Sequence, residues 1–299
     1  MTPVRCAVFL GSLLAAGAAA QTSGKAPYPP PGRLVDVGGY RVHIDCAGEG
    51  SPAVVVVGAG FSFDWGLVQP EVAKFTRVCT YDPSGTAWSD PGPAPTCPNR
   101  VAEIHALLKN AGIDGPYVLV GLSIGALAAR FYASQYPNEV GGMVVVDHAF
   151  LDPVDDSPPV PVRTPGLDSP PVLISKTPIV FTIEDISNFN NLPQRNRELH
   201  RWAASLKPVL PGVETAKECA AQIDAATRGR SRALGDIPLA VVSTTNDAPN
   251  YPKLQAKLLA LSNRSHQLIS KKSFHAIEID EPEVVIRAVR QVVEAVRSN

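Results

Sequence analysis

The chain has 299 residues, of which 45% are hydrophobic, and its formal net charge at pH 7 is −1. This composition is typical of a globular protein with a sizeable core, arranged as one large domain or two small ones. The near-neutral charge, with no block of Lys or Arg, argues against nucleic acid or an anionic membrane surface as a partner.

The N-terminus resembles a secretory signal. Arg5 precedes an apolar run, residues 6–20, that ends in three alanines. We therefore expect residues 1–20 to be a signal peptide, residues 21–31 to be a Pro-rich leader outside the fold, and the mature protein to be secreted or periplasmic. The alternative is a short buried helix. No later segment has the roughly 18 apolar residues of a membrane span, so we expect no stable membrane insertion.

Strand and helix signals alternate along most of the chain. Strands are predicted at 33–37, 40–45, 53–57, 77–81, 117–120, 143–146, 239–243 and 266–270, and helices at 70–75, 101–110, 124–136, 251–261 and from about 283. The alternation fails from 151 to 235, where prolines crowd and polar helical stretches follow. The pattern predicts an α/β core of residues 32–150 and 236–299, with residues 151–235 inserted as a lid.

A single hydroxyl stands where the strand 117–120 meets the next helix, in Gly121-Leu122-Ser123-Ile124-Gly125. A G-x-S-x-G turn forces the serine into a tight, strained geometry and exposes its hydroxyl above the sheet. Negative charge that develops beside a residue at a helix start also meets free backbone N–H groups. Ser123 is therefore a candidate nucleophile, and the alternative is a helix N-cap serine.

A serine nucleophile needs a base, usually a His oriented by a carboxylate. Of the six histidines, His275 lies in the loop between the last predicted strand and the last helix. Parallel sheets expose their chemistry in the loops that follow their strands, so His275 is the favoured base. His148, which also follows a strand, is the alternative. The remaining histidines are assigned no catalytic role: His43, His105, His200 and His266.

Two aspartates satisfy the requirement for the orienting acid. Asp247 lies in the loop after the strand 239–243, and Asp147 closes the strand 143–146. We favour Asp247, because an aspartate directly at a strand end more often shapes the turn. Asp82 is expected to order the turn at residues 83–85.

Four cysteines remain outside the signal-like segment, and they allow three pairings: Cys46, Cys79, Cys97 and Cys219. In an oxidising compartment they would form two disulfides, and the alternative is four buried free thiols. The sequence has no C-x-x-C motif, so it gives little support for a zinc site or a redox-active cysteine motif.

Five motifs, in this order, resemble the α/β-hydrolase superfamily and specifically its secreted esterase-like members. They are GAGFSFDW at 58–65, YDPSGTAWSDPGP at 81–93, GLSIG at 121–125, IPLAVVSTTND at 237–247 and SFHAIEIDEPEVV at 273–285. The resemblance implies an α/β-hydrolase fold, a mostly parallel sheet flanked by helices with an inserted lid. It also implies a serine hydrolase that cleaves a small-molecule carboxylic ester without a metal or organic cofactor.

The resemblance assigns roles to individual residues. Ser123 would be the nucleophile, His275 the general base and then acid, and Asp247 the residue that orients it. The oxyanion hole would use the backbone N–H of Ile124 and a second donor. Gly58-Ala59 stands where the family often has His-Gly, which points to Gly60, with Phe61 as the alternative.

The resemblance has further consequences for the cysteines and the lid. In this fold the second and fourth strands are antiparallel neighbours, which would pair Cys46 with Cys79 and leave Cys97 for Cys219. The lid would shape the substrate pocket, and its candidate wall residues, which equally suit packing onto the body, are Phe181, Phe189 and Trp202.

Two other functions stay open. A peptidase or amidase on this scaffold would use lid carboxylates to hold a substrate amine, and the candidates are Glu184, Asp185 and Glu198. A non-catalytic binding protein of the same fold is the third possibility. It is weakened because candidates for all three catalytic residues are present.

Overall fold

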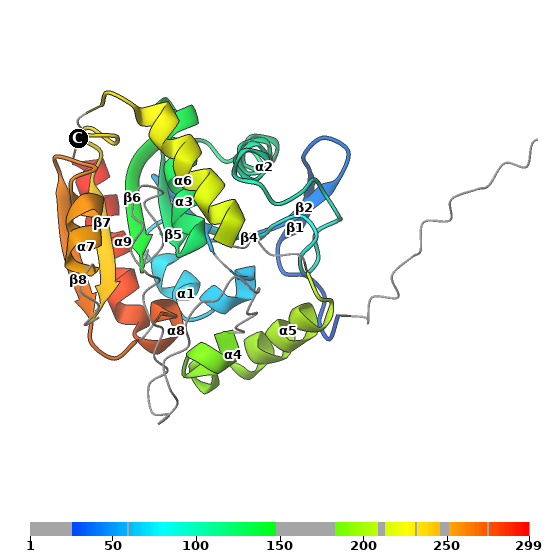
Figure 1. Ribbon diagram of the computed structural model, residues 1–299. Helices are drawn as coiled ribbons and strands as arrows, with labels where there is room; N and C mark the ends of the chain where they lie inside the picture. Colours follow the sequence, from blue (N-terminus) through cyan, green and yellow to red (C-terminus); the bar gives the residue numbers. More distant parts are fainter. Residues whose placement is uncertain are drawn as a thin grey trace, which may run out of the picture.

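The computed structural model describes residues 26–58, 60–147, 183–208, 213–230, 232–245, 251–273 and 275–298. Their strands form one eight-stranded sheet in the order β1-β2-β4-β3-β5-β6-β7-β8 (Figure 1). The strands are β1 (Arg33–Asp36), β2 (Arg41–Ala47), β3 (Ala53–Val57), β4 (Val78–Asp82), β5 (Tyr117–Leu122), β6 (Val140–Val146), β7 (Leu239–Thr244) and β8 (Ser265–Ser270). Only the β1–β2 and β2–β4 pairs are antiparallel; the other neighbours are parallel.

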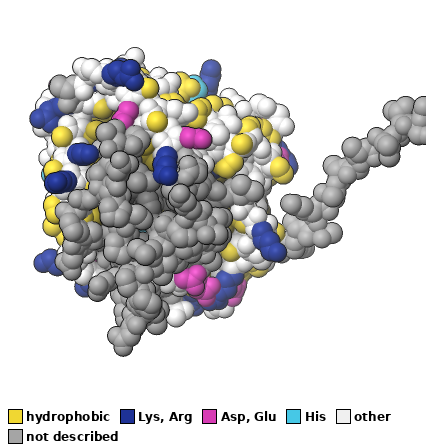
Figure 2. Space-filling view, viewed as in Figure 1, with side chains coloured by type: hydrophobic (Ala, Val, Ile, Leu, Met, Phe, Trp, Pro, Cys, Tyr) yellow, Lys and Arg dark blue, Asp and Glu magenta, His cyan; other side chains and the backbone are white. Residues whose placement is uncertain are grey.

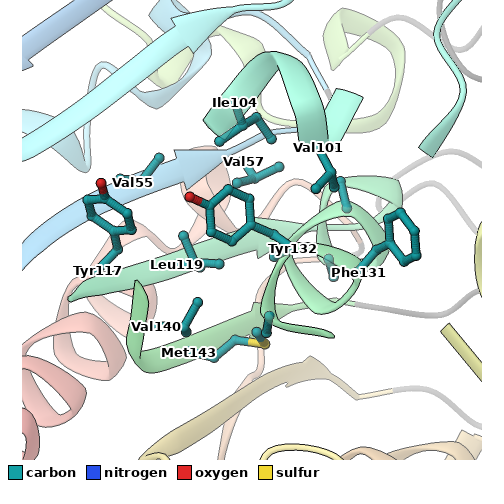
Figure 3. Packing of buried hydrophobic residues seen from close by; sticks show 14 of the residues in the cluster. Val55, Val57, Val101, Ile104, Tyr117, Leu119, Phe131, Tyr132, Val140 and Met143 are labelled. Carbon is teal, nitrogen blue, oxygen red and sulfur yellow. The ribbon is translucent and has the colours of Figure 1, made fainter. Parts of the chain in front are cut away.

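Helices cover both faces of this sheet, which explains why its central strands are continuously apolar. Successive side chains of a strand point to opposite faces. On β3, Val55 and Val57 join the core beneath α2 (Cys97–Asn110) and α3 (Ile124–Gln135), while Val54 and Val56 join the core beneath α1 (Gln69–Val72) and α9 (Pro282–Arg297). Figure 3 shows the first of these cores.

The remaining helices complete the layers and the carboxyl end of the sheet. The α-helices are α4 (Ile183–Ile186), α5 (Gln194–Ser205), α6 (Val213–Thr227), α7 (Tyr251–Leu259) and α8 (Ile277–Asp280), and the 3-10 helices are η1 (Ser62–Trp65), η2 (Pro137–Glu139) and η3 (Phe189–Asn191). Figure 1 shows α5 and α8 near the carboxyl ends of the parallel strands.

The predicted strands and helices are confirmed within the described residues, with differences at their ends. The largest is at α2, which begins at Cys97 instead of residue 101. Thr96 caps this helix by accepting the backbone N–H of Asn99 at 3.4 Å, and Pro98 lies in its first turn. A capping Thr and an early Pro are helix-start signals, so the sequence carried the correct boundary.

Helix α6 contributes to the main core, although its residues fall within the predicted lid. Its buried side chains pack on α3 and share one core with it: Ala216, Cys219, Ala220 and Ile223. Helix α5 instead packs on η1 at the carboxyl end of the sheet. The first part of the predicted lid, residues 151–182, lies outside the described residues.

Both disulfides that the resemblance implied are present. Cys46 and Cys79 are direct partners in the β2–β4 register, so the bond joins two antiparallel strands. The Cys97–Cys219 bond ties the start of α2 to α6. The second bond therefore fastens part of the predicted lid to the body.

Residues 26–31, which were expected to lie outside the fold, contact it. The Tyr28 hydroxyl donates a hydrogen bond to Glu198 on α5, and the Pro31 carbonyl bonds His43 Nε2. The predicted signal peptide lies outside the described residues.

On the face shown in Figure 2, charged side chains of both signs are scattered among other residues. Within the ranges that the structure describes, no helix combines the length and apolarity needed to cross a bilayer.

Candidate active site

Ser123 occupies a strained turn between β5 and α3, as the motif predicts. Its backbone φ is +53° and ψ is −123°, and its N–H donates to the Val146 carbonyl at 3.0 Å. A Cβ at Gly125 would lie 1.9 Å from the Val57 carbonyl oxygen, and one at Gly121 would lie 2.5 Å from Ala126 Cα. Only glycine fits at both positions, which is the requirement of a nucleophile elbow.

His275 meets an aspartate beside this turn, and the aspartate is Asp147. His275 Nδ1 lies 2.5 Å from Asp147 Oδ2, and the two side chains are 22% and 4% exposed. Asp147 directly follows Val146, whose carbonyl accepts the N–H of Ser123. Ser123, Asp147 and His275 therefore follow β5, β6 and β8 at the carboxyl edge of the sheet.

The favoured acid of the sequence analysis, Asp247, lies outside the described residues, as does His148. The preference for Asp247 assumed that an aspartate at a strand end shapes the turn. Asp147 does have a left-handed backbone, with φ +37°, and its N–H donates to the Val242 carbonyl at 2.8 Å. With this backbone, the Asp147 carboxylate contacts His275. One aspartate can therefore both form part of the turn and orient the histidine.

Two hydroxyl-bearing residues that the sequence analysis missed support Asp147 from β7 and α7. The Tyr251 hydroxyl donates to Asp147 Oδ1 at 3.2 Å, and the Thr244 hydroxyl lies 3.5 Å from the same oxygen. Burial, followed by the charge of Asp147, raises the pKa of Tyr251 to about 12. Tyr251 therefore remains a donor at neutral pH, and its hydrogen bond holds Asp147 Oδ1 in place.

Contacts in the loop after β3 distinguish between Gly60 and Phe61, the two candidates for the second oxyanion donor. The Phe61 N–H is already bonded to Asp64 Oδ2 at 2.9 Å. Gly60 and Ile124 line the same pocket, next to the elbow. This arrangement favours Gly60 over Phe61.

That pocket runs from the Gly60 and Ile124 backbones toward α2 and α6. Most of its lining is apolar, including Tyr81 and the Cys97–Cys219 disulfide. Arg100 also lines it, in an ion pair of 3.2 Å with the buried Glu103 carboxylate. A largely apolar cavity with few polar groups is typical of a small-molecule site.

The expected lid wall residues pack elsewhere. The Trp202 and Trp88 rings contact each other at a tilt, with centroids 5.3 Å apart, and the Phe189 ring lies 5.2 Å from the His200 ring. Neither residue lines the pocket described above. Phe181 lies outside the described residues.

His43 and Asp82 form a second His–Asp pair, which is fully buried between β2 and β4. His43 Nδ1 lies 2.7 Å from Asp82 Oδ2, and Asp82 also accepts the Ser62 N–H at 2.8 Å. Burial lowers the pKa of His43, but the hydrogen bond and charge of Asp82 outweigh it and the net pKa is raised. Asp82 thus joins β2, β4 and η1, a wider role than ordering its own turn.

Two further histidines of the described residues, His105 and His266, make surface contacts. The His105 ring stacks on Tyr136 at 4.0 Å, and His266 bonds Gln291 at 2.9 Å. Among the described residues, no group of three or more His, Cys, Asp or Glu side chains could hold a metal ion.

Comparisons with known proteins agree with this architecture. An uncharacterised protein, YqjL of Bacillus subtilis, is 25% identical over 255 residues, which cover 82% of this chain and 85% of that protein. A thermophilic esterase from Thermogutta terrifontis aligns with a TM-score of 0.57 at 20% identity, covering 86% of this chain and 94% of the esterase. The epoxide hydrolase VrEH1 from Vigna radiata aligns with a TM-score of 0.67 at 14% identity, covering 88% and 97%.

These structural likenesses show the fold alone, because fold and chemistry vary independently. The sequence match is more specific: residues 53–288 match the family model described as the alpha/beta hydrolase family. This segment contains the elbow serine, both oxyanion candidates and the His–Asp pair. The chain belongs to the α/β hydrolase superfamily.

Proposed function

We propose that the protein is a serine hydrolase that cleaves carboxylic esters through an acyl-enzyme, with Ser123, His275 and Asp147 as its triad. The observation that carries the proposal is the 2.5 Å contact between His275 Nδ1 and Asp147 beside a strained serine turn. In this proposal Asp147 takes the orienting role that the resemblance gave to Asp247.

The contact defines how the histidine would act. Because Asp147 occupies Nδ1, Nε2 is the nitrogen that takes the Ser123 proton as the serine oxygen bonds to the ester carbonyl carbon. The backbone N–H groups of Gly60 and Ile124 stabilise the oxyanion, and each such donor contributes on the order of 3 kcal/mol to the transition state. His275 then protonates the leaving alcohol and later activates the water that hydrolyses the acyl-enzyme.

Ser123 at the elbow favours ester cleavage over the epoxide hydrolysis named for one structural neighbour. A hydroxyl nucleophile gives an acyl-enzyme from a carbonyl substrate. Lid carboxylates that a peptidase would need are already engaged. Glu184 pairs with Arg201 at 2.6 Å, and Glu198 accepts hydrogen bonds from Tyr28 and Gln194. These contacts favour an ester over a peptide substrate.

Export belongs to the same proposal. Two disulfides fasten the described body, and such bonds persist in oxidising compartments. Together with the signal-like N-terminus, they support a secreted or periplasmic protein.

A fluorophosphonate probe tests the nucleophile directly. The wild type and the exposed control Ser205→Ala should carry one covalent adduct, and Ser123→Ala should carry none. Equal labelling of Ser123→Ala, or an unlabelled wild type, would reject the proposal. A panel of p-nitrophenyl esters of increasing acyl length, set against amino-acid anilides, then distinguishes esterase from peptidase activity.

A further inference from the structure

A third His–Asp pair, which is buried, lies between α5 and the segment that follows Gly60, and the proposed chemistry does not use it. His200 Nδ1 lies 2.8 Å from Asp64 Oδ1, with side chains 6% and 1% exposed. The two residues are 136 positions apart in the chain. The rings of Phe61 and Phe189 contact the His200 ring at 5.3 and 5.2 Å and shield the pair from water.

The other oxygen of Asp64 holds the proposed oxyanion segment. Asp64 Oδ2 accepts the Phe61 N–H at 2.9 Å. The same oxygen lies 2.5 Å from the point that a Gly60 Cβ would occupy, so it packs against the backbone of Gly60 itself. Because the direction of the Gly60 N–H depends on this backbone, the position of the carboxylate sets the aim of the donor.

Helix α5 grips η1 at a second point, one turn before His200. The Asn196 amide donates to the Phe63 carbonyl at 2.7 Å and lies against Gly66. Residues four apart lie on one face of a helix, so Asn196 and His200 place the same face of α5 against the segment after β3. Asn196 bonds a backbone carbonyl of η1, whereas His200 bonds the Asp64 carboxylate, which contacts Gly60.

We propose that Asp64 and His200 are positioning residues, which hold the Gly60–Phe61 segment in the geometry that an oxyanion donor requires. This inference rests on the proposed function. Without the histidine, Asp64 Oδ1 would lose its hydrogen-bond partner in a buried position, and such a group reorients or recruits water. A donor N–H displaced by less than an ångström stabilises the oxyanion of the transition state less well. Such a displacement affects substrate binding less.

The groups that face the pair act on the pKa of His200 in opposite directions. Burial lowers the pKa of His200, but the hydrogen bond and charge of Asp64 outweigh it, and the net pKa is raised. Glu184 adds to the rise and Arg201 opposes it. The buried Glu278, whose own pKa is raised, faces Asp64 from α8.

The test compares kcat and KM for four variants on one p-nitrophenyl ester. His200→Leu should lower kcat by about 10- to 100-fold with KM changed less than about threefold, because the defect lies in the transition state. His200→Asn places an amide nitrogen where Nδ1 stood and should recover kcat to within about threefold of wild type. His200→Gln places its amide one bond further and should remain at least about fivefold below His200→Asn.

Asn196→Ala is the matched control, since it removes a bond between α5 and η1 and keeps the His200–Asp64 hydrogen bond. It should lower thermal stability and leave kcat within about twofold. A second readout is the affinity for a trifluoromethyl ketone, which mimics the tetrahedral oxyanion. In His200→Leu this affinity should fall by the same factor as kcat.

Several results would overturn the inference. They are an unchanged kcat in a folded His200→Leu protein, equal losses of kcat in Asn196→Ala and His200→Leu, and equal kcat values for His200→Asn and His200→Gln. The last comparison decides the matter even where the leucine variant does not fold. An unlabelled wild type in the fluorophosphonate experiment would instead reject the proposed function, so the two failures are distinguishable.

Discussion

The imidazole of His275 lies 2.5 Å from the carboxylate of Asp147, although 128 positions separate the two residues in the chain. The β5–β6 pairing brings Asp147 next to Ser123, because the residue before Asp147 accepts the Ser123 N–H. The loop after β8 delivers the histidine. The account of function depends on this meeting at one edge of the sheet.

Tyr251→Phe should reduce activity without destroying it. The change removes the hydroxyl that donates to Asp147 Oδ1 at 3.2 Å, and a hydrogen bond to a charged group contributes about 1.5–3 kcal/mol. We expect kcat to fall by about 3- to 30-fold with KM nearly unchanged, because a less firmly held Asp147 orients His275 less well. Steady-state kinetics on one ester measures this.

Thr244→Val is the companion variant, since its hydroxyl is 3.5 Å from the same oxygen. It should lower kcat less than Tyr251→Phe does. A larger loss of kcat in Thr244→Val than in Tyr251→Phe would contradict the inference that Tyr251 holds Asp147 more firmly than Thr244 does.

The two disulfides should stabilise the fold unequally. The bonds Cys46–Cys79 and Cys97–Cys219 span sequence separations of 33 and 122. A longer closed loop restricts the unfolded chain more, and the chain-entropy model gives a difference of about 1 kcal/mol for these lengths. Each paired Cys→Ser variant should lose about 2–5 kcal/mol of unfolding free energy, with the larger loss for Cys97 and Cys219.

Urea unfolding at fixed pH measures both losses. Because the Cys97–Cys219 bond also lines the pocket, its removal should raise KM in addition to lowering stability. A variant lacking Cys46 and Cys79 provides the control, with reduced stability and an unchanged KM.

Glu278 should make stability depend on pH. This side chain is fully buried, burial raises its pKa well above the usual range, and neither carboxyl oxygen has a hydrogen-bond partner among the described residues. A raised folded-state pKa means that the native protein holds the proton more tightly. Stability is therefore lost as pH rises above about 4.3, the ordinary pKa of Glu, toward the folded-state value.

Glu278→Gln removes this titration. It should have a higher melting temperature than the wild type at pH 8, by at least about 2 °C, and the difference should shrink toward pH 4. The exposed Glu283→Gln variant is the control and should show no such trend. A difference between Glu278→Gln and wild type that grows on acidification would contradict the assignment.

The sequence predicts the elements near the site because local signals agree there. The run of apolar residues at 53–57 fits a strand buried on both faces, and it is β3. The glycines around Ser123 predict a strained turn, and their close contacts with Val57 and Ala126 explain why no larger residue fits. Such features depend on neighbours in the chain, so they can be inferred from a short segment.

The choice of acid depends on distant contacts and could not be inferred in this way. Asp147 and Asp247 both follow apolar strands, and the sequence does not reveal the path of the four residues between β8 and His275. The Asp64–His200 pair was missed for the same reason, since α5 has no signal for where it docks. Helix α6 looked like a polar lid element because its buried face consists of alanines, Cys219 and Ile223.

The most direct test of the central claim compares kcat for Asp147→Asn and Asp247→Asn on the same ester. Asparagine keeps the size of the side chain and removes its charge, so a lost orienting carboxylate should lower kcat by about 10³- to 10⁴-fold. The account predicts this loss for Asp147→Asn, with Asp247→Asn within about threefold of wild type. The reverse result, a large loss in Asp247→Asn and near-normal activity in Asp147→Asn, would contradict it.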